Sequence, residues 1–378
     1  MNTITILIIL VLTPYVIFPS IIILANKLRK LFSPIESVNL PKFERVSIII
    51  PILNEELKIF KKFENLQNLS FDKSILEIIF YLDGTTDNSE KKIIECKTLF
   101  PNLDVKILKN KENYGRAVAH NSSVKESKYN FLVFTDIETI FEKDFLINIV
   151  TKLNDVDVGM VVGKLIFNSE EPVGKVEKFY FGLETYLRSQ LSDLNLLMTG
   201  TGAAMAIKKE LYEDLRPDED IDDSLPFIVA KKNKKILFAE NCIAYDEPVS
   251  ELESQFLSRS RMSSKGLTAF LYRWSAINSL KFPFLTLTFI FHKICKWLTG
   301  LWLILIYAIS LYSMAIGSST LSFFVIFSLS LCLLLCVLNI FFKWHLNSLE
   351  RISSVIYAIF GALWGLVVAL RKKTKHGY

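Results

Sequence analysis

Cysteine is scarce in this 378-residue sequence, and the cysteines that occur are not paired at an informative spacing. There is no C-x-x-C pair, and the two cysteines nearest each other in the sequence, Cys332 and Cys336, lie within a long apolar run rather than in a polar metal-binding segment. A disulfide scaffold and a zinc ribbon are therefore excluded, and a reducing, cytosolic environment suits the soluble part of the chain. The five cysteines are Cys96, Cys242, Cys295, Cys332 and Cys336.

A large excess of one charge is also missing. Lys+Arg number 44 and Asp+Glu number 39, so the net charge is only +5, and the cations are dispersed. This excludes a nucleic-acid partner, because binding to phosphate backbones requires a broad basic surface. The loops G-x-x-x-x-G-K-[S/T] and G-x-G-x-x-G are absent, which argues against a P-loop kinase and a nicotinamide dehydrogenase.

Long apolar runs are abundant, and hydrophobic residues make up 51% of the sequence. Residues 4–25 carry no charge, and about 22 such residues can span a hydrocarbon layer of about 30 Å. Basic residues follow this run, at Lys27, Arg29 and Lys30. Residues 1–30 are therefore predicted to be a transmembrane anchor, kinked at Pro14 and Pro19, in a multi-pass protein of the plasma (inner) membrane whose next domain is cytoplasmic.

A second apolar block follows near the C-terminus. Residues 281–297 mix aromatic residues with cations and predict an interfacial amphipathic helix whose cations reach for water. Residues 298–371 contain about three apolar runs that predict transmembrane helices, and 372–378 form a basic tail. If all three C-terminal runs crossed after a cytoplasmic domain, this tail would lie outside, against the positive-inside rule. The sequence therefore leaves open whether the last run crosses.

Between these blocks, residues 42–275 predict a cytoplasmic α/β domain. Short β-branched runs alternate with segments of helical period, at 46–50, 75–82, 105–108 and 131–135. This alternation is typical of a doubly wound, mostly parallel sheet that is buried on both faces.

Carboxylates and amides follow three of these predicted strands, at Asn54 and Glu55, at Asp83, and at Asp136 and Glu138. The Asp83-Gly84 pair alone is equally typical of a turn, and Asp136 and Glu138 alone could simply end a strand. Together they fall on the carboxyl edge of one sheet, where open α/β sheets bind ligands. Mg²⁺ or Mn²⁺ prefers such oxygen ligands, so we expect a divalent cation and a nucleotide diphosphate at this edge.

Four segments in this order resemble glycosyltransferase family 2, whose fold is the nucleotide-binding GT-A α/β sheet. They are SIIIPILNEE (47–56), YLDGTTDNS (81–89), NYGRAVAHNSSVKES (113–127) and FLVFTDIET (131–139). The resemblance implies that Asp136 and Glu138 hold the metal, with Glu138 standing where aspartate is commoner. The donor-binding residues that it implies are Pro51, Asn54, Glu55, Asp83, Arg116 and Asp136.

The resemblance also implies an acceptor side and a diphosphate clamp. Asp222 and Asp223 match the acidic motif of the acceptor side, with Asp223 as the catalytic base, although a solvated acidic loop has the same composition. Gly200 and Gly202 resemble the small-residue segment near the acceptor. Arg259 and Arg261 resemble the arginines of the Q-x-x-R-W motif and would contact the diphosphate, but Met262 stands in place of tryptophan.

The sequence thus predicts a membrane-bound, metal-dependent, inverting glycosyltransferase. Its donor is a nucleotide sugar, for which a UDP-sugar is favoured, and its acceptor is lipid-linked or a cell-surface glycan, in contact with membrane lipids. Two alternatives stay open: a processive polysaccharide synthase with a degenerate Q-x-x-R-W motif, and a catalytically silent membrane scaffold. The sequence identifies no protein partner.

Overall fold

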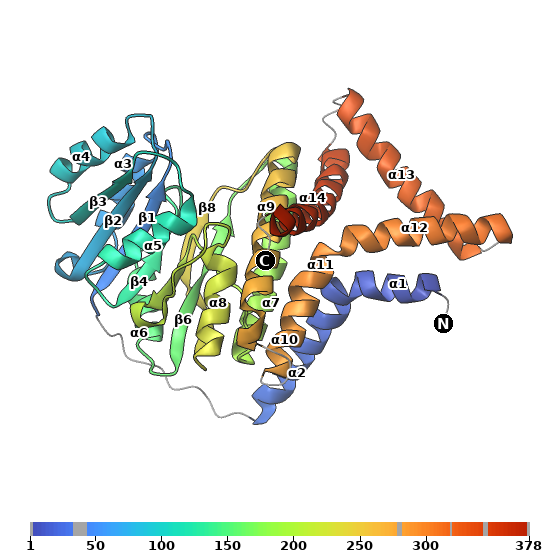
Figure 1. Cartoon of the computed structure of the whole chain (residues 1–378), viewed down its shortest axis with the longest axis horizontal. Coiled ribbons are helices and arrows are strands. Elements are labelled where there is room, and N and C mark those ends of the chain that lie inside the picture. The colour runs from blue at the N-terminus through green and yellow to red at the C-terminus, as the bar shows by residue number, and fades with distance from the viewer. Residues whose placement is uncertain (1–2, 33–43, 278–281, 318–319, 343–346, 376–378) are drawn as a thin grey trace.

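The structure, a computed structural model, describes residues 3–32, 44–277, 282–317, 320–342 and 347–375. An α/β domain lies at one end of the molecule, and a group of long apolar helices extends from the other (Figure 1). This second group contains helices from both ends of the chain. The N-terminal and C-terminal helices flank the α/β domain in the sequence but come together in space.

One eight-stranded sheet forms the centre of the α/β domain, in the order β3-β2-β1-β4-β7-β6-β8-β5. Four of the seven strand pairings are parallel, including those of β1 with β2 and β4, whereas β7 is antiparallel to both its neighbours. The predicted sheet is confirmed, with the short β5 as an unpredicted edge strand. The strands are β1 (Val46–Ile52), β2 (Leu76–Asp83), β3 (Asp104–Asn110), β4 (Phe131–Phe134), β5 (Ile140–Phe141), β6 (Val158–Phe167), β7 (Met205–Lys208) and β8 (Lys235–Asp246).

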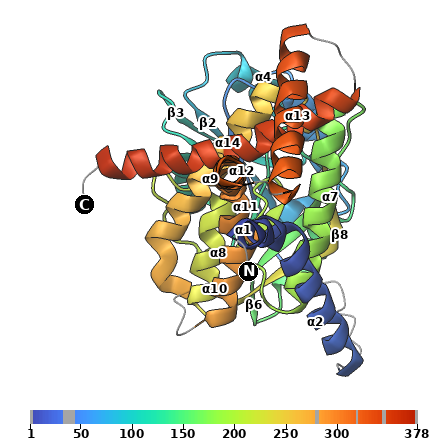
Figure 2. The same ribbon diagram turned by 90° about the vertical axis from the view of Figure 1, so that its right-hand side faces the viewer.

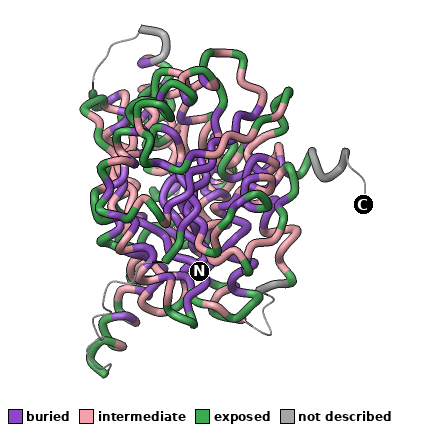
Figure 3. The backbone as a smooth tube through the Cα atoms, turned by 90° about the vertical axis from the view of Figure 1, so that its left-hand side faces the viewer, coloured by how far each residue is buried: buried purple, intermediate pink, exposed green. Residues whose placement is uncertain are grey.

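Helices cover both faces of the sheet. On one face, α3, α4 and α6 bury Phe63 and Phe145 against Phe80 of the sheet, and on the other α5, α7 and α8 pack around Phe134. Burying one such side chain stabilises the fold by about 1.5–3 kcal/mol. Figure 3 shows the buried segments concentrated in the middle of the domain. These helices are α3 (Ile59–Gln67), α4 (Ser89–Leu99), α5 (Arg116–Glu126), α6 (Phe145–Leu153), α7 (Pro172–Asp193) and α8 (Ile221–Lys231), and α9 (Leu252–Arg273) packs against α8.

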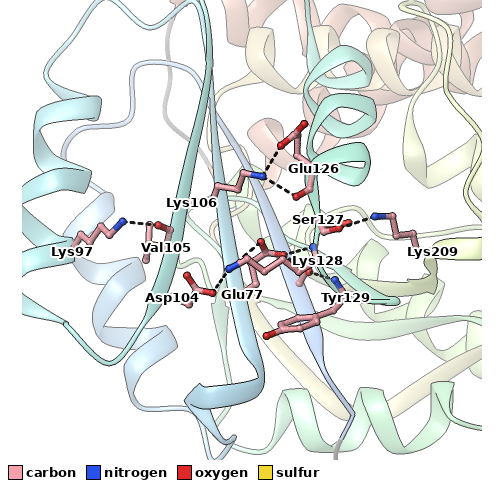
Figure 4. A network of polar contacts seen from close by, with 11 residues as sticks. Glu77, Lys97, Asp104, Val105, Lys106, Glu126, Ser127, Lys128, Tyr129 and Lys209 are labelled. Carbon is pink, nitrogen blue, oxygen red and sulfur yellow. Dashed lines mark hydrogen bonds and ion pairs between the residues drawn. The ribbon is translucent and has the colours of Figure 1, made fainter.

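The amino edge of the sheet is closed by a polar network (Figure 4). Glu77, fully buried at the start of β2, accepts hydrogen bonds from the Ser47 hydroxyl at 2.5 Å and from the Lys128 N–H at 2.8 Å. The Lys128 ammonium pairs with Asp104 at the start of β3, at 2.7 Å. These contacts hold the first strands in register and leave the carboxyl edge for ligands.

The helices outside the α/β domain come from both ends of the chain. At the N-terminus, α1 (Thr3–Leu12) and α2 (Phe18–Phe32) meet at a π-helical turn, Thr13–Ile17, that contains Pro14. Figure 1 shows a clear bend there, as predicted for Pro14, whereas Pro19 lies within α2 and does not interrupt it. The C-terminal group is α10 (Pro283–Phe289), a π-helical turn (Ile290–Ile294), α11 (Cys295–Trp297), α12 (Thr299–Ile316), α13 (Thr320–Phe342) and α14 (Asn347–Lys375).

Among the residues that the structure describes, four helical segments are long and apolar enough to cross a membrane. They are Thr3–Phe32, Thr299–Ile316, Thr320–Asn339 and Asn347–Arg371.

One sequence prediction about the segment 281–297 is wrong. Its His292 and Lys296 do not reach for water, because both side chains are buried against Glu184 of α7. The His292 Nε2 lies 2.8 Å from Glu184 Oε1, and the Lys296 ammonium lies 2.7 Å from Oε2. Burial alone would raise the pKa of Glu184, but the two partners outweigh burial and lower it. The segment is therefore joined to the α/β domain by a buried ionic cluster.

Candidate functional site

The loops after β1 and β2 are tied to each other at the carboxyl edge. Asn54 adopts a left-handed backbone conformation, with φ of 55°, and its side-chain oxygen accepts the Thr86 N–H at 2.8 Å. The Glu55 N–H donates to the Ser89 hydroxyl at 3.1 Å. Pro51 lies in β1 itself, just before this loop. Three of the predicted donor-binding residues are thus brought to one rim.

Asp83 has a structural role that extends beyond the turn indicated by the Asp83-Gly84 pair. Its buried carboxylate accepts the backbone N–H groups of Tyr114 and Gly115, at 3.0 and 2.7 Å. The loop passes so close that a Cβ on Gly84 would lie 2.4 Å from the Asn113 nitrogen. Asp83 and Gly84 therefore fix the loop that leads into α5, and a contact of Asp83 with the donor stays a prediction.

Arg116 begins α5 directly after this loop, and its guanidinium donates to the carboxylate of Asp136 beyond β4. The negative charge of Asp136 raises the pKa of Arg116 further above its ordinary value. The predicted donor-binding arginine and the predicted metal ligand therefore contact each other.

Lys62 supports the loop that carries Asp136 and Glu138, and the sequence analysis missed it. This lysine of α3 is fully buried. Its ammonium donates to the Thr135 hydroxyl at 3.0 Å, to the Asp136 carbonyl at 2.9 Å and to the Thr139 carbonyl at 2.6 Å. Three acceptors match the three N–H donors of an ammonium group, and burial lowers the pKa of Lys62 to about 7.

A signal for Lys62 was present in the sequence. Ile59, Phe63 and Leu66 form the apolar stripe of α3, and Lys62 falls on the same stripe. A lysine at a core-facing position requires buried acceptors, so the pattern predicts a polar partner inside the domain.

Further charges surround Glu138. The Lys58 ammonium lies 3.8 Å from Glu138 and 2.9 Å from Glu55. Asp246, at the end of β8, accepts the Thr139 hydroxyl at 3.1 Å. Burial, with the nearby charges of Glu138 and Asp136, raises the pKa of Asp246 to about 6. The edge therefore gathers more negative charge than the sequence indicated.

These carboxylates are suited to a hard divalent cation, and their present partners are cations. Arg116 contacts Asp136, and Lys58 lies near Glu138. In the described part of the chain, no three His, Cys, Asp or Glu side chains already converge as a set of metal ligands. The chemistry of the donor atoms fits Mg²⁺ or Mn²⁺, because oxygen ligands are the ones that these ions prefer.

The predicted acceptor-side residues are also brought together. The Gly200 N–H donates to the Asp222 carbonyl at 2.7 Å, and a Cβ on Gly202 would lie 2.5 Å from the Asp222 carboxylate. Glycine is therefore needed at position 202 for this close approach. Burial, with the charges of Asp220 and Asp223, raises the pKa of Asp222 to about 7.

The three aspartates at the start of α8 differ in their surroundings. Asp220 caps the helix and pairs with Lys265 of α9 at 2.9 Å; burial opposes its ionisation, but Lys265 and Arg116 outweigh burial and lower its pKa. Asp223 is 8% exposed, and burial raises its pKa. A Cβ on Gly266 would lie 3.2 Å from the Asp223 carboxylate and 2.6 Å from the Trp297 ring, so Asp223 faces α9 and α11.

The two arginines of α9 are placed differently from the prediction of a diphosphate clamp. Arg259 pairs with Glu177 of α7 at 2.6 Å, and Gln255 donates to the same carboxylate at 2.6 Å. Arg261 is exposed. The cation that α9 presents to the acidic turn of α8 is instead Lys265. The clamp stays a prediction, for which Arg259 would have to leave Glu177.

The chain is similar in sequence and in fold to known proteins. Residues 47–216 match the family model of Glycosyl transferase family 2. The poly-beta-1,6-N-acetyl-D-glucosamine synthase of Staphylococcus aureus (strain COL) is 25% identical over 181 residues, which cover 47% of this chain and 43% of that protein. Glycosyltransferase AglE of Haloferax volcanii is 23% identical over 172 residues, 46% of this chain and 55% of that one. The chain thus matches about half the length of these relatives.

A solved structure resembles almost the whole chain. It is the mannosyltransferase PcManGT from Pyrobaculum calidifontis, in complex with GDP-Man and Mn²⁺. The TM-score is 0.70 at 19% sequence identity, and the match covers 96% of this chain and 99% of that one. At this identity the likeness establishes a shared fold.

Proposed function

We propose that this chain, whose residues 47–216 form a domain of glycosyl transferase family 2 on a GT-A fold, transfers a sugar from a nucleotide-sugar donor to an acceptor held at a membrane. The acceptor is a lipid-linked or cell-surface glycan, and transfer proceeds with inversion. The observation that carries the proposal is the contact between Arg116 and Asp136 at the carboxyl edge, with the acidic turn of α8 near enough for both charges to act on Asp222. The apolar helices on both sides of the domain support the location at a membrane.

Asp136 and Glu138 would hold Mg²⁺ or Mn²⁺, with Asp246 close behind them. The bound ion supplies positive charge that stabilises the departing nucleoside diphosphate. Arg116, at the N-terminus of α5, adds a guanidinium and free backbone N–H groups, which together suit a phosphate. The sequence favours a UDP-sugar, and the solved structure contains GDP-Man, so both nucleotides are candidates.

The base that removes the acceptor proton belongs to the first turn of α8. The resemblance implies Asp223, but Asp222 suits the role better, because it is less buried and its raised pKa makes its carboxylate a stronger base. The charges acting on Asp222 include Arg116 and Asp136, which supports a position near the donor. Asp220 is engaged by Lys265.

Removal of the divalent cation tests the proposal at the level of the reaction. Purified protein in detergent is expected to transfer sugar from one radiolabelled donor to a membrane-lipid extract, to lose this activity in EDTA and to regain it with Mn²⁺ or Mg²⁺. The product is measured by thin-layer chromatography. Full activity in EDTA would contradict the metal assignment but not the transfer reaction.

Activity should rise with pH through a value near 7, because Asp222 must be ionised to act as the base.

The stability of the fold should depend on pH in the opposite direction. The folded-state pKa of Asp222, about 7, lies above its ordinary value of 3.8, so its contribution to stability is complete below pH 4 and is lost as pH rises through 7. Rate and thermal midpoint measured from pH 5 to 9 check both trends, and the Asp222→Asn variant should lose this component of the stability profile.

Lys62 is expected to position the metal-binding loop. Lys62→Met removes three hydrogen bonds to residues 135–139 and should weaken Mn²⁺ binding by about 10–100-fold, as loss of a supporting contact does at other metal sites. Lys61→Met is the matched control, because Lys61 is the exposed neighbour on the same helix. Mn²⁺ affinity is measured by electron paramagnetic resonance with a nucleoside diphosphate present, alongside the thermal midpoint. Unchanged affinity in a folded Lys62→Met protein would contradict this role.

A processive polysaccharide synthase is the second candidate, because a curated relative is named as the synthase of a sugar polymer. Against it, Met262 stands in place of tryptophan, and Arg259 is bound to Glu177. Product length separates the two: single additions support the first proposal, and long chains from one donor support the second.

A further inference from the structure

The helix α14 lies across the other apolar helices. In Figure 1, α1 and α12 are seen lengthwise while α14 points toward the viewer. In Figure 2, turned by 90°, α14 is seen lengthwise, and α1 and α12 are seen end-on. If α1 and α12 cross a bilayer along its normal, α14 must lie along the membrane plane. Residues 347–371 of α14 are nevertheless apolar enough to span a membrane.

The contact between α14 and α9 of the catalytic domain is very close. A Cβ on Gly365 would lie 2.0 Å from the Ser263 hydroxyl oxygen and 2.2 Å from the Ser260 carbonyl oxygen. A Cβ on Gly361 would lie 2.7 Å from the Phe256 carbonyl oxygen. The Ser263 hydroxyl donates to the Ala362 carbonyl at 2.8 Å. Only glycine at these two positions lets the backbones approach so closely, so α14 is docked on α9.

The position of α9 shows that α14, which is docked on it, cannot lie at the centre of a bilayer. Through Lys265 it reaches Asp220, and through Arg259 it reaches Glu177, so α9 is part of the catalytic domain. Arg261 on the same helix is exposed. Charged groups are costly inside a bilayer, so α9 lies outside the hydrocarbon, and the helix docked along it lies at its boundary.

A contact between α12 and α14 also places α14 at the boundary of the bilayer, next to the catalytic domain. A Cβ on Gly300 would lie 3.2 Å from the Leu363 side chain. Gly300 is in the first turn of α12, immediately after α11, whose Trp297 packs near Gly266 of α9. The part of α12 that α14 contacts is therefore the end nearest the catalytic domain.

We infer that α14 does not cross the membrane but lies in the headgroup region, on the side of the catalytic domain. The protein then crosses the membrane with three segments, the N-terminal helix and the hairpin of α12 and α13. Half-exposed Trp364 and Leu370 face the interface, where tryptophan is favoured, and the Arg371 guanidinium lies 5.7 Å from the Trp364 ring centre. The basic residues from 371 to 375 are expected to contact anionic lipid headgroups.

This arrangement removes the conflict in the sequence. With three crossings in total, by the N-terminal helix, α12 and α13, the basic tail lies on the same side as the α/β domain and the basic residues that follow the first helix. The positive-inside rule requires this arrangement. With four crossings the tail would lie on the opposite side. An odd and an even number of crossings place the tail on opposite sides of the membrane. A measurement of the side on which the tail lies therefore distinguishes the two arrangements without an assay of enzymatic activity.

The test is cysteine labelling of sealed membrane vesicles with a membrane-impermeant maleimide, in a variant whose five native cysteines are replaced by serine. Three single cysteines are compared: Val156→Cys in the catalytic domain, Gly317→Cys between α12 and α13, and Gly377→Cys in the tail. Position 156 is 74% exposed, and a side chain at 317 has open space around it. Positions 377 and 156 should label from the same side, and 317 from the other. Labelling of 377 together with 317 would overturn the inference.

A substitution at the crossing provides an independent check. Gly365→Leu should lower the thermal midpoint and make the C-terminal tail more susceptible to protease, because its side chain cannot fit against α9. Gly182→Leu on α7, where a Cβ meets nothing within 4 Å, is the matched control and should leave both unchanged. Equal behaviour of the two variants would contradict the docking of α14 on α9.

Discussion

Asp136→Asn is expected to lower the rate of sugar transfer by at least about a hundredfold, the effect of losing one group that stabilises developing charge. Asparagine is nearly the same size but carries no charge, so it weakens both the metal site and the pairing with Arg116. The rate constant of transfer and the Mn²⁺ affinity should fall together. Asp157→Asn is the control, because Asp157 is an exposed aspartate in a surface ion pair.

A folded Asp136→Asn protein with wild-type turnover would exclude Asp136 from the site. If Mn²⁺ affinity fell while turnover were retained, the carboxylate would bind metal without a role in the reaction. Glu138→Gln, tested in the same way, shows which of the two carboxylates is the principal ligand.

Asp222→Asn should have the second large effect, a loss of about 10²–10⁴-fold in turnover with little change in donor affinity. A general base contributes in the transition state, and its removal leaves ground-state binding of the donor intact. The measurement is the rate constant with saturating acceptor, together with the dissociation constant of the donor. The low activity should also lose the rise near pH 7.

The neighbouring aspartates are the controls for this assignment. Asp223→Asn should keep most of the turnover, since Asp223 faces Gly266 and Trp297. Asp220→Asn should mainly lower stability, through loss of the helix cap and of the pair with Lys265. Complete loss in Asp223→Asn with activity retained in Asp222→Asn would return the role of base to Asp223.

The sequence was sufficient to predict the sheet and which polar residues lie at its carboxyl edge. Buried parallel strands form continuous apolar runs, so the segments at 46–50 and 131–135 were recognisable, and residues that follow such strands must meet at one edge. Asn54, Asp83 and Asp136 were found in this way. The edge strand β5, with only Ile140 and Phe141, is too short for its period to be detected.

Side-chain partners between distant segments could not be predicted in the same way. Arg259 and Lys265 lie on one helix, and only the packing of α9 decides that Lys265 meets Asp220 while Arg259 meets Glu177. The burial of Lys296 depends likewise on a carboxylate more than a hundred residues away. The prediction that Lys296 reaches for water assumed an isolated interfacial helix, and the structure provides Glu184 as its partner.

The apolar helix α14 shows the same limit of sequence-based prediction. Composition marks residues 352–370 as a possible span, since hydropathy measures what a segment could do in isolation. Gly361 and Gly365 give that segment an alternative partner in α9, which is encoded by close backbone packing rather than by hydropathy.

The central claim is that the carboxyl edge of this sheet binds a metal and a nucleotide sugar and transfers the sugar. The most direct test is a panel of radiolabelled UDP- and GDP-sugars, each incubated with purified protein, Mn²⁺ and a membrane-lipid extract, for wild type and Asp136→Asn. We predict that wild type transfers sugar from one donor and that Asp136→Asn transfers from none. Absence of transfer and hydrolysis with every donor in a folded wild-type protein, or equal activity of the variant, would contradict this account.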